Sequence, residues 1–114
     1  MTRVPPGQAL LSTRVLAVLR TEDSRHVAVT MDALVEAGLR CLEVTMNTPG
    51  ALDLLREARV RLPADVELGA GTVLTASDVD AVWEIGGSFV VAPDARPDVA
   101  ARARPSTDGQ AVGT

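Results

Sequence analysis

A strand–helix unit that occurs four times in succession is the feature that most constrains how this chain can fold. Short runs rich in apolar residues predict strands at 14–20, 41–47, 66–73 and 88–93. Apolar residues at helical spacing predict helices at 24–38, 48–63, 75–87 and 96–105. Strands that alternate with helices are typical of a parallel sheet with right-handed crossovers, so the predicted fold class is α/β.

The ends of these helices carry capping signals. Ser24 is expected to cap the first helix, and Gly38 to stop it. Thr48 is expected to cap the second helix, with Pro49 as its first helical residue. Thr75 or Ser77 would cap the third. These signals favour short connections between each strand and its helix.

The chain divides into three segments. Residues 1–13 are an N-terminal segment, and 14–104 form the (βα)₄ domain. Residues 105–114 are small and polar without periodicity, which predicts a disordered tail. The four units could form a small open sheet. They could also be the first half of an eight-unit barrel, which takes about 250 residues, or about 200 at the short end.

Composition restricts the partners and the chemistry. A net charge of −4 and a pI of about 4.8 argue against nucleic acid and anionic membranes as partners. One cysteine and no apolar run of signal-peptide or membrane-spanning length favour a cytoplasmic protein. No set of residues has metal-ligand spacing, so no metal site is expected. All 11 basic residues are arginine, so no lysine amine is available for covalent catalysis.

The stretch "CLEVTMNTP" at 41–49 places a glutamate in the middle of a predicted strand. Alternate residues point apolar side chains to one face and Glu43, Thr45 and Asn47 to the other. Both faces of a parallel sheet are normally covered. Burial would raise the pKa of Glu43 toward the range of a general acid or base. The alternative is a glutamate at the rim, in water or paired with Arg20 or Arg40.

The segments "LVEAGLRCLEVTMNTPGAL" and "VELGAGTVLTASDVDAVWEIGGSFVVAPD" resemble the 2-keto-3-deoxy-6-phosphogluconate aldolase family and its phosphogalactonate-cleaving relatives. Those enzymes are class I aldolases with a (β/α)₈ TIM barrel. The resemblance runs from about Arg14 to Asp98. It implies the first four βα units of such a barrel, with parallel strands in sequence order.

The resemblance also implies roles for particular residues. Glu43 would shuttle protons to and from the Schiff-base intermediate and the hydroxyl at the bond that is cleaved. Gly71, Thr72 and Arg20 would hold the pyruvyl carboxylate. Alternatively, the glycines of "GAGT" serve tight packing, and Arg20 is a solvated loop charge.

Further positions that the resemblance assigns to substrate binding are Thr45, Asn47 and Pro93. Phosphogluconate-type members usually carry an arginine where this chain has Asn47. The sequences "VLR" and "MNTP" are similar instead to the phosphogalactonate type. By contrast, Cys41, His26 and Trp83 are interpreted as structural residues.

The family's Schiff-base lysine lies on strand 6, and its phosphate-binding loops lie near strands 7 and 8. Neither feature has a counterpart here, which suggests a truncated chain. One hypothesis is therefore an aldolase-family lyase that is inactive alone. It would act on pyruvate or a phosphorylated keto-deoxy sugar acid, need no cofactor, and form a homo-oligomer, as the trimeric full-length family does. The other hypothesis is a non-catalytic half-barrel that binds or assembles.

Overall fold

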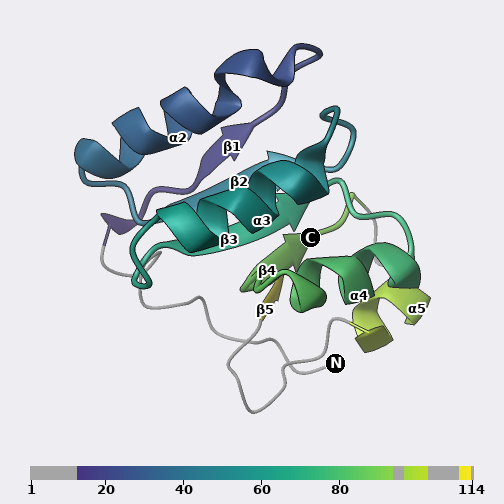
Figure 1. Ribbon diagram of the computed structural model, residues 1–114. Coiled ribbons are helices and arrows are strands. Elements are labelled where there is room, and N and C mark those ends of the chain that lie inside the picture. The colour runs from purple at the N-terminus through teal and green to yellow at the C-terminus, as the bar shows by residue number, and fades with distance from the viewer. Residues whose placement is uncertain (1–12, 94–96, 103–110, 114) are drawn as a thin grey trace.

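Parallel strands form one sheet in the order in which they occur along the chain (Figure 1). The structure, a computed structural model, describes residues 13–93, 97–102 and 111–113. Its strands are β1 (Ala17–Leu19), β2 (Cys41–Thr45), β3 (Glu67–Gly71), β4 (Phe89–Val91) and β5 (Ala111–Gly113). The parallel order of the first four strands confirms the expectation from the strand–helix repeat.

The helices connect successive strands and follow one another along one face of the sheet (Figure 1). They are the 3₁₀ helix η1 (Ser24–His26), α2 (Val27–Glu36), α3 (Ala51–Arg61), α4 (Ala76–Glu84) and α5 (Pro97–Arg102). Within the described residues, strands β1 to β4 and helices α3 and α4 are shorter than the sequence predicts. None of the described helices combines the length and apolar character needed to cross a membrane.

The core lies between the sheet and these helices. Leu42 and Val44 of β2 are fully buried, as are Met31 of α2 and Leu55 of α3. Burying one such side chain contributes about 1.5–3 kcal/mol to the free energy of unfolding. This layer therefore fixes which face of each strand turns away from the helices.

The opposite face of the sheet carries a row of four residues from neighbouring strands. In register, Val18 lies beside Glu43, Glu43 beside Gly69, and Gly69 beside Phe89. Paired residues of parallel strands point to the same face, so Glu43 points away from the helices. This is the face that the alternation in "CLEVT" predicts for it.

Strand β5 is not expected from the sequence. It lies within 105–114, for which the sequence predicts disorder, and that prediction is wrong for residues 111–113. They pair in parallel with β4. An unpaired strand edge accepts almost any short segment, because the pairing uses backbone groups rather than a side-chain pattern. Residues 103–110 and 114 of the predicted tail lie outside the described residues, as do 1–12 and 94–96.

Two of the three predicted helix caps are wrong. Asp23 rather than Ser24 caps η1, because its carboxylate accepts a hydrogen bond from the Arg25 amide. Helix α3 begins at Ala51 after Gly50, whose φ of 69° is left-handed, so Thr48 does not cap it. Thr75 does cap α4, since its side chain accepts from the Asp78 amide.

Candidate active site

Glu43 is a buried carboxylate in the central part of the sheet. Its side chain is on the face opposite the helices, and the residue is 4% exposed. Its Oε2 atom is buried without a hydrogen-bond partner among the described residues. Burial of this kind rules out the alternative of a rim glutamate in water. A buried polar atom without a partner is costly, which makes it a candidate for a functional group.

Gly71 provides the space that the carboxylate occupies. A Cβ atom at Gly71 would overlap Oε1 of Glu43 and would lie 3.4 Å from Cγ2 of Thr45. Gly69 has a similar relation to Phe89, whose ring takes the place of its missing side chain. Close packing in "GAGT" is therefore real. At Gly71, what packs closely is the candidate acid or base.

Arg20 and Thr72 meet across the ends of β1 and β3. Nη2 of Arg20 donates a hydrogen bond of 3.0 Å to Oγ1 of Thr72. Thr72 directly follows Gly71, so the guanidinium lies near the Glu43 carboxylate. Thr72 adopts a φ of 56°, which is unfavourable for a β-branched residue. Arg20 is exposed, but it is not simply a solvated loop charge.

Burial raises the pKa of Glu43, and the positive charge of Arg20 opposes that rise in part. The direction agrees with the expectation for a desolvated carboxyl group. The neighbouring Cys41 is also buried, and burial together with Glu67 and Glu43 raises the pKa of its thiol to about 11. A thiol with that pKa is protonated at neutral pH, as expected for a structural cysteine rather than a nucleophile.

The remaining predicted binding residues differ in exposure. Thr45 is buried, and its Oγ1 lies 3.1 Å from Oγ1 of Thr48. Asn47 and Pro93 are exposed, after the carboxyl ends of β2 and β4. Their roles in substrate binding stay predictions. In open parallel sheets and barrels alike, this end of the strands is where ligands bind.

Sequence reasoning missed one buried polar residue near the site. Thr48 is buried, and its hydroxyl contacts both Thr45 and the backbone of Thr21. Its position before a proline suggested a helix cap instead. Only its hydrogen bond to the Thr21 amide, 27 positions earlier in the sequence, distinguishes a contact near the site from a helix cap.

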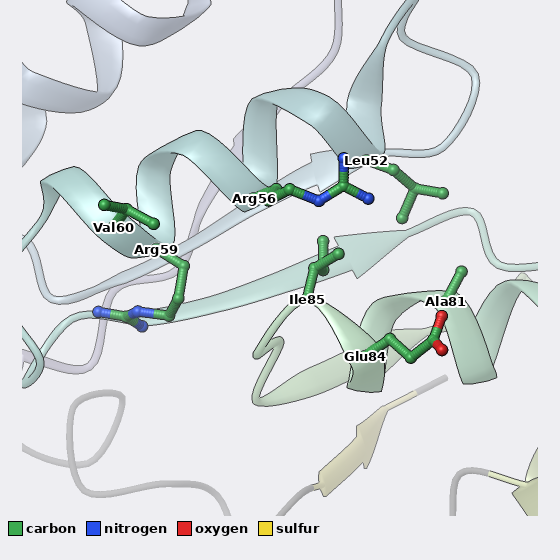
Figure 2. Close-up of a pocket in the computed structure, with 7 residues that line it drawn as sticks. All are labelled: Leu52, Arg56, Arg59, Val60, Ala81, Glu84 and Ile85. Carbon is green, nitrogen blue, oxygen red and sulfur yellow. The ribbon is translucent and has the colours of Figure 1, made fainter.

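A pocket lies away from this site, between α3 and α4 on the helical layer (Figure 2). It is lined by Leu52, Arg56, Arg59, Val60, Ala81, Glu84 and Ile85. The Arg59 guanidinium already donates to the carbonyl oxygens of Val66 and Pro63, at 2.6 and 2.7 Å. Within the described residues no cluster of His, Cys, Asp and Glu could hold a metal ion.

A buried carboxylate thus lies beside a glycine, an arginine and a threonine at the carboxyl ends of parallel βα strands, the end at which barrels of this type carry their active sites. Comparison with known proteins specifies this class further. The family described as "KDPG and KHG aldolase" matches residues 7–109. The chain therefore belongs to the KDPG and KHG aldolase family.

Individual relatives agree with this assignment. A 2-dehydro-3-deoxy-phosphogluconate aldolase from Treponema pallidum is 38% identical over 82% of this chain and 44% of its own length. A probable 2-dehydro-3-deoxy-6-phosphogalactonate aldolase from Rhizobium meliloti is 32% identical, over 75% of this chain and 40% of its own length. The chain thus spans less than half the length of these relatives, and both substrate types occur among them.

A solved structure gives the same result for the fold. The KDPG aldolase from Legionella pneumophila, with pyruvate captured as a covalent carbinolamine intermediate, matches with a TM-score of 0.74 and 25% identity. The match covers 85% of this chain and 46% of that one. The four βα units are thus those of half an aldolase barrel.

Proposed function

We propose that this chain supplies half of the active site of a class I aldolase that acts on 2-keto-3-deoxy-phospho-sugar acids. Cleavage would give pyruvate and glyceraldehyde 3-phosphate. The observation that carries the proposal is the buried Glu43 carboxylate, with one oxygen over Gly71 and the other without a partner. Its raised pKa suits a group that accepts and returns a proton near neutral pH.

Arg20 and Thr72 would bind the carboxylate of the pyruvyl group. A guanidinium is a strong partner for a carboxylate. The Thr72 hydroxyl holds the Arg20 guanidinium at the ends of β1 and β3 by accepting its hydrogen bond. The bound keto acid would then lie close to Glu43. Proximity of this kind brings the carbon that must exchange a proton within reach of the shuttle.

The Schiff-base lysine would come from outside these 114 residues, because they contain none. Attack of a lysine amine on the keto carbon, with loss of water, forms the imine that makes carbon–carbon cleavage possible. The chain alone would therefore bind pyruvate without forming a covalent adduct. The pyruvate captured in the Legionella pneumophila relative supports this choice of ligand.

Titration calorimetry of the 114-residue chain with pyruvate tests the binding half of the proposal. Binding should occur in the wild type and weaken strongly in Arg20→Gln. It should be nearly unchanged in Arg25→Gln, an exposed arginine paired with Asp23. Equal affinities of both variants would contradict the assignment of Arg20.

A fusion tests the catalytic half. Residues 1–93 joined to the second half of the Treponema pallidum relative should release pyruvate from 2-keto-3-deoxy-6-phosphogluconate or its galactonate epimer. Glu43→Gln in the same fusion should abolish release and keep pyruvate binding. Robust turnover by the unfused chain would overturn the proposed division of the active site.

The second hypothesis, a non-catalytic half-barrel that assembles, has one observation in its favour. Val15 and Val18 leave large apolar side chains exposed near β1, the first strand of the sheet order. Exposed apolar residues on an edge strand favour association with another chain. A chain that self-associates but does not bind pyruvate would select this hypothesis over the aldolase half-site.

A further inference from the structure

We propose that Thr48 is a positioning residue whose buried hydroxyl holds Arg20 in place through the backbone of Thr21. The proposal rests on the proposed function, because it gives Arg20 the task of binding a carboxylate. It adds to the site a residue that the sequence predicted only as a helix cap. Thr48 does not itself touch the reacting atoms.

The contact with Thr21 fixes the chain directly after Arg20. Thr48 is 2% exposed, and its Oγ1 accepts a hydrogen bond of 3.3 Å from the Thr21 amide. Strand β1 ends at Leu19, so its pairing with β2 no longer holds Arg20. Beyond that point the Thr21 amide bonds to Thr48, in the turn that follows β2. Removing it would let the Arg20 backbone move relative to Thr72.

The same hydroxyl also contacts Thr45, which follows Glu43 on the same face of β2 and is paired with Gly71. Oγ1 of Thr48 lies 3.1 Å from Oγ1 of Thr45, and both groups are buried. Cγ2 of Thr45 borders the space over Gly71 that the Glu43 carboxylate fills. Thr48 therefore joins the segment that carries Arg20 to the strand that carries Glu43.

A purely structural role in the turn does not explain the hydroxyl. The turn after β2 is held by backbone hydrogen bonds, from the Thr48 amide to the Thr45 carbonyl at 2.9 Å and from the Ala51 amide to the Thr48 carbonyl at 3.1 Å. These bonds do not depend on the side chain. A valine, which has nearly the same shape, should therefore keep the turn while it removes the hydroxyl.

The first test compares Thr48→Val with Thr48→Ser, and with Thr30→Val as a control. Thr30 is an exposed threonine on α2 whose hydroxyl bonds to the His26 carbonyl. Thr48→Val should weaken pyruvate binding by roughly three- to tenfold, the range expected for one hydrogen bond. Thr48→Ser should restore affinity to within about twofold of the wild type on the same scale, and Thr30→Val should leave it unchanged. Unchanged affinity in Thr48→Val would overturn the proposal.

A double-mutant cycle tests whether Thr48 acts through Arg20. In an Arg20→Gln background, Thr48→Val should cause no further loss of affinity, because the group that it positions is already gone. An equal loss in both backgrounds would show that Thr48 acts independently of Arg20, and the proposal would fail.

Hydrogen exchange separates this proposal from the proposed function. The Thr21 amide should be protected in the wild type and in Thr48→Ser, and should exchange faster in Thr48→Val. If the wild type does not bind pyruvate, the proposed function fails, while this exchange result still decides whether Thr48 holds the chain after Arg20. Unchanged protection of Thr21 in Thr48→Val would refute the contact.

Discussion

Oε1 of Glu43 occupies the place in which any residue other than glycine at position 71 would put its Cβ atom. The two residues lie on neighbouring strands, and Gly71 is paired in register with Thr45, two residues beyond Glu43. The glutamate side chain therefore leans toward the carboxyl end of the sheet. The position of the Glu43 carboxylate, the candidate proton shuttle, therefore depends on the absence of a side chain at residue 71.

Gly71→Ala should displace the Glu43 carboxylate. Overpacking of a filled site costs about 1–3 kcal/mol in free energy of unfolding, and pyruvate binding should fall with it. Gly50→Ala is the control, because Gly50 has a left-handed φ of 69° but a Cβ atom there would meet no atom within 4 Å. It should cost about 1–2 kcal/mol from backbone strain alone and leave pyruvate binding intact. Urea unfolding and calorimetry distinguish the two, and normal binding in Gly71→Ala would contradict the predicted displacement.

The raised pKa of Glu43 makes stability depend on pH in a defined direction. The folded state holds the proton more tightly than the unfolded state, in which the pKa is near 4.5. The free energy of unfolding should therefore fall as the pH rises from 4.5 through the raised pKa of Glu43. Below 4.5 both states are protonated and this contribution is constant.

Glu43→Gln should remove this pH dependence and make the chain more stable than the wild type at pH 7. Glu57→Gln, which changes an exposed glutamate on α3, should keep it. Urea unfolding at several pH values between 4 and 8 measures the effect. The prediction fails if the free energy of unfolding of the wild type rises with pH through this range and Glu43→Gln removes that rise. Such a result would show that the fold stabilises Glu43 in its charged form.

Thr72→Gly should separate stability from binding. A left-handed φ costs a β-branched residue about 1–2 kcal/mol, and glycine loses about 0.5–1 kcal/mol to backbone entropy, so the substitution should stabilise the fold by up to about 1.5 kcal/mol. It should also weaken pyruvate binding, because Arg20 loses its partner. Arg14→Gly is the matched control, since Arg14 has a φ of 58° away from the site. A gain in both stability and affinity from Thr72→Gly would contradict the role given to the hydroxyl.

Val18 should control self-association. It is 54% exposed on the face opposite the helices, in the row that includes Glu43. Val18→Arg should shift the sedimentation of the chain at micromolar concentration toward a monomer, because a charge there opposes contact between two apolar edges. Val29→Arg, on α2 at 68% exposure, should not change it. A wild type that sediments as a monomer would remove the basis for this assembly.

Patterns within one strand or helix predicted the fold well. The order of the first four strands and the face on which Glu43 lies both follow from the repeat and from the alternation in "CLEVT". These features depend on residues close together in sequence. Burial of Leu42 and Val44 on one face leaves Glu43 only the other.

Contacts between distant residues could not be predicted in the same way. Arg20 and Thr72 are 52 positions apart, and although both were expected at the site, no local pattern specifies their hydrogen bond. Thr48 resembles a helix cap in sequence, and only its contact with Thr21 reveals another role. Strand β5 has no alternating pattern that predicts a strand, and only its parallel backbone pairing with β4 identifies it.

The left-handed backbone of Thr72 limits which residues position 72 can hold without strain. Random substitution at a position with φ near 56° favours glycine, asparagine or aspartate, which adopt that conformation at little cost. A lineage without any use for the Thr72 hydroxyl would drift toward those residues and gain stability. Threonine at this position therefore costs the fold stability, and the hydrogen bond that its hydroxyl accepts from Arg20 is what the structure shows in return.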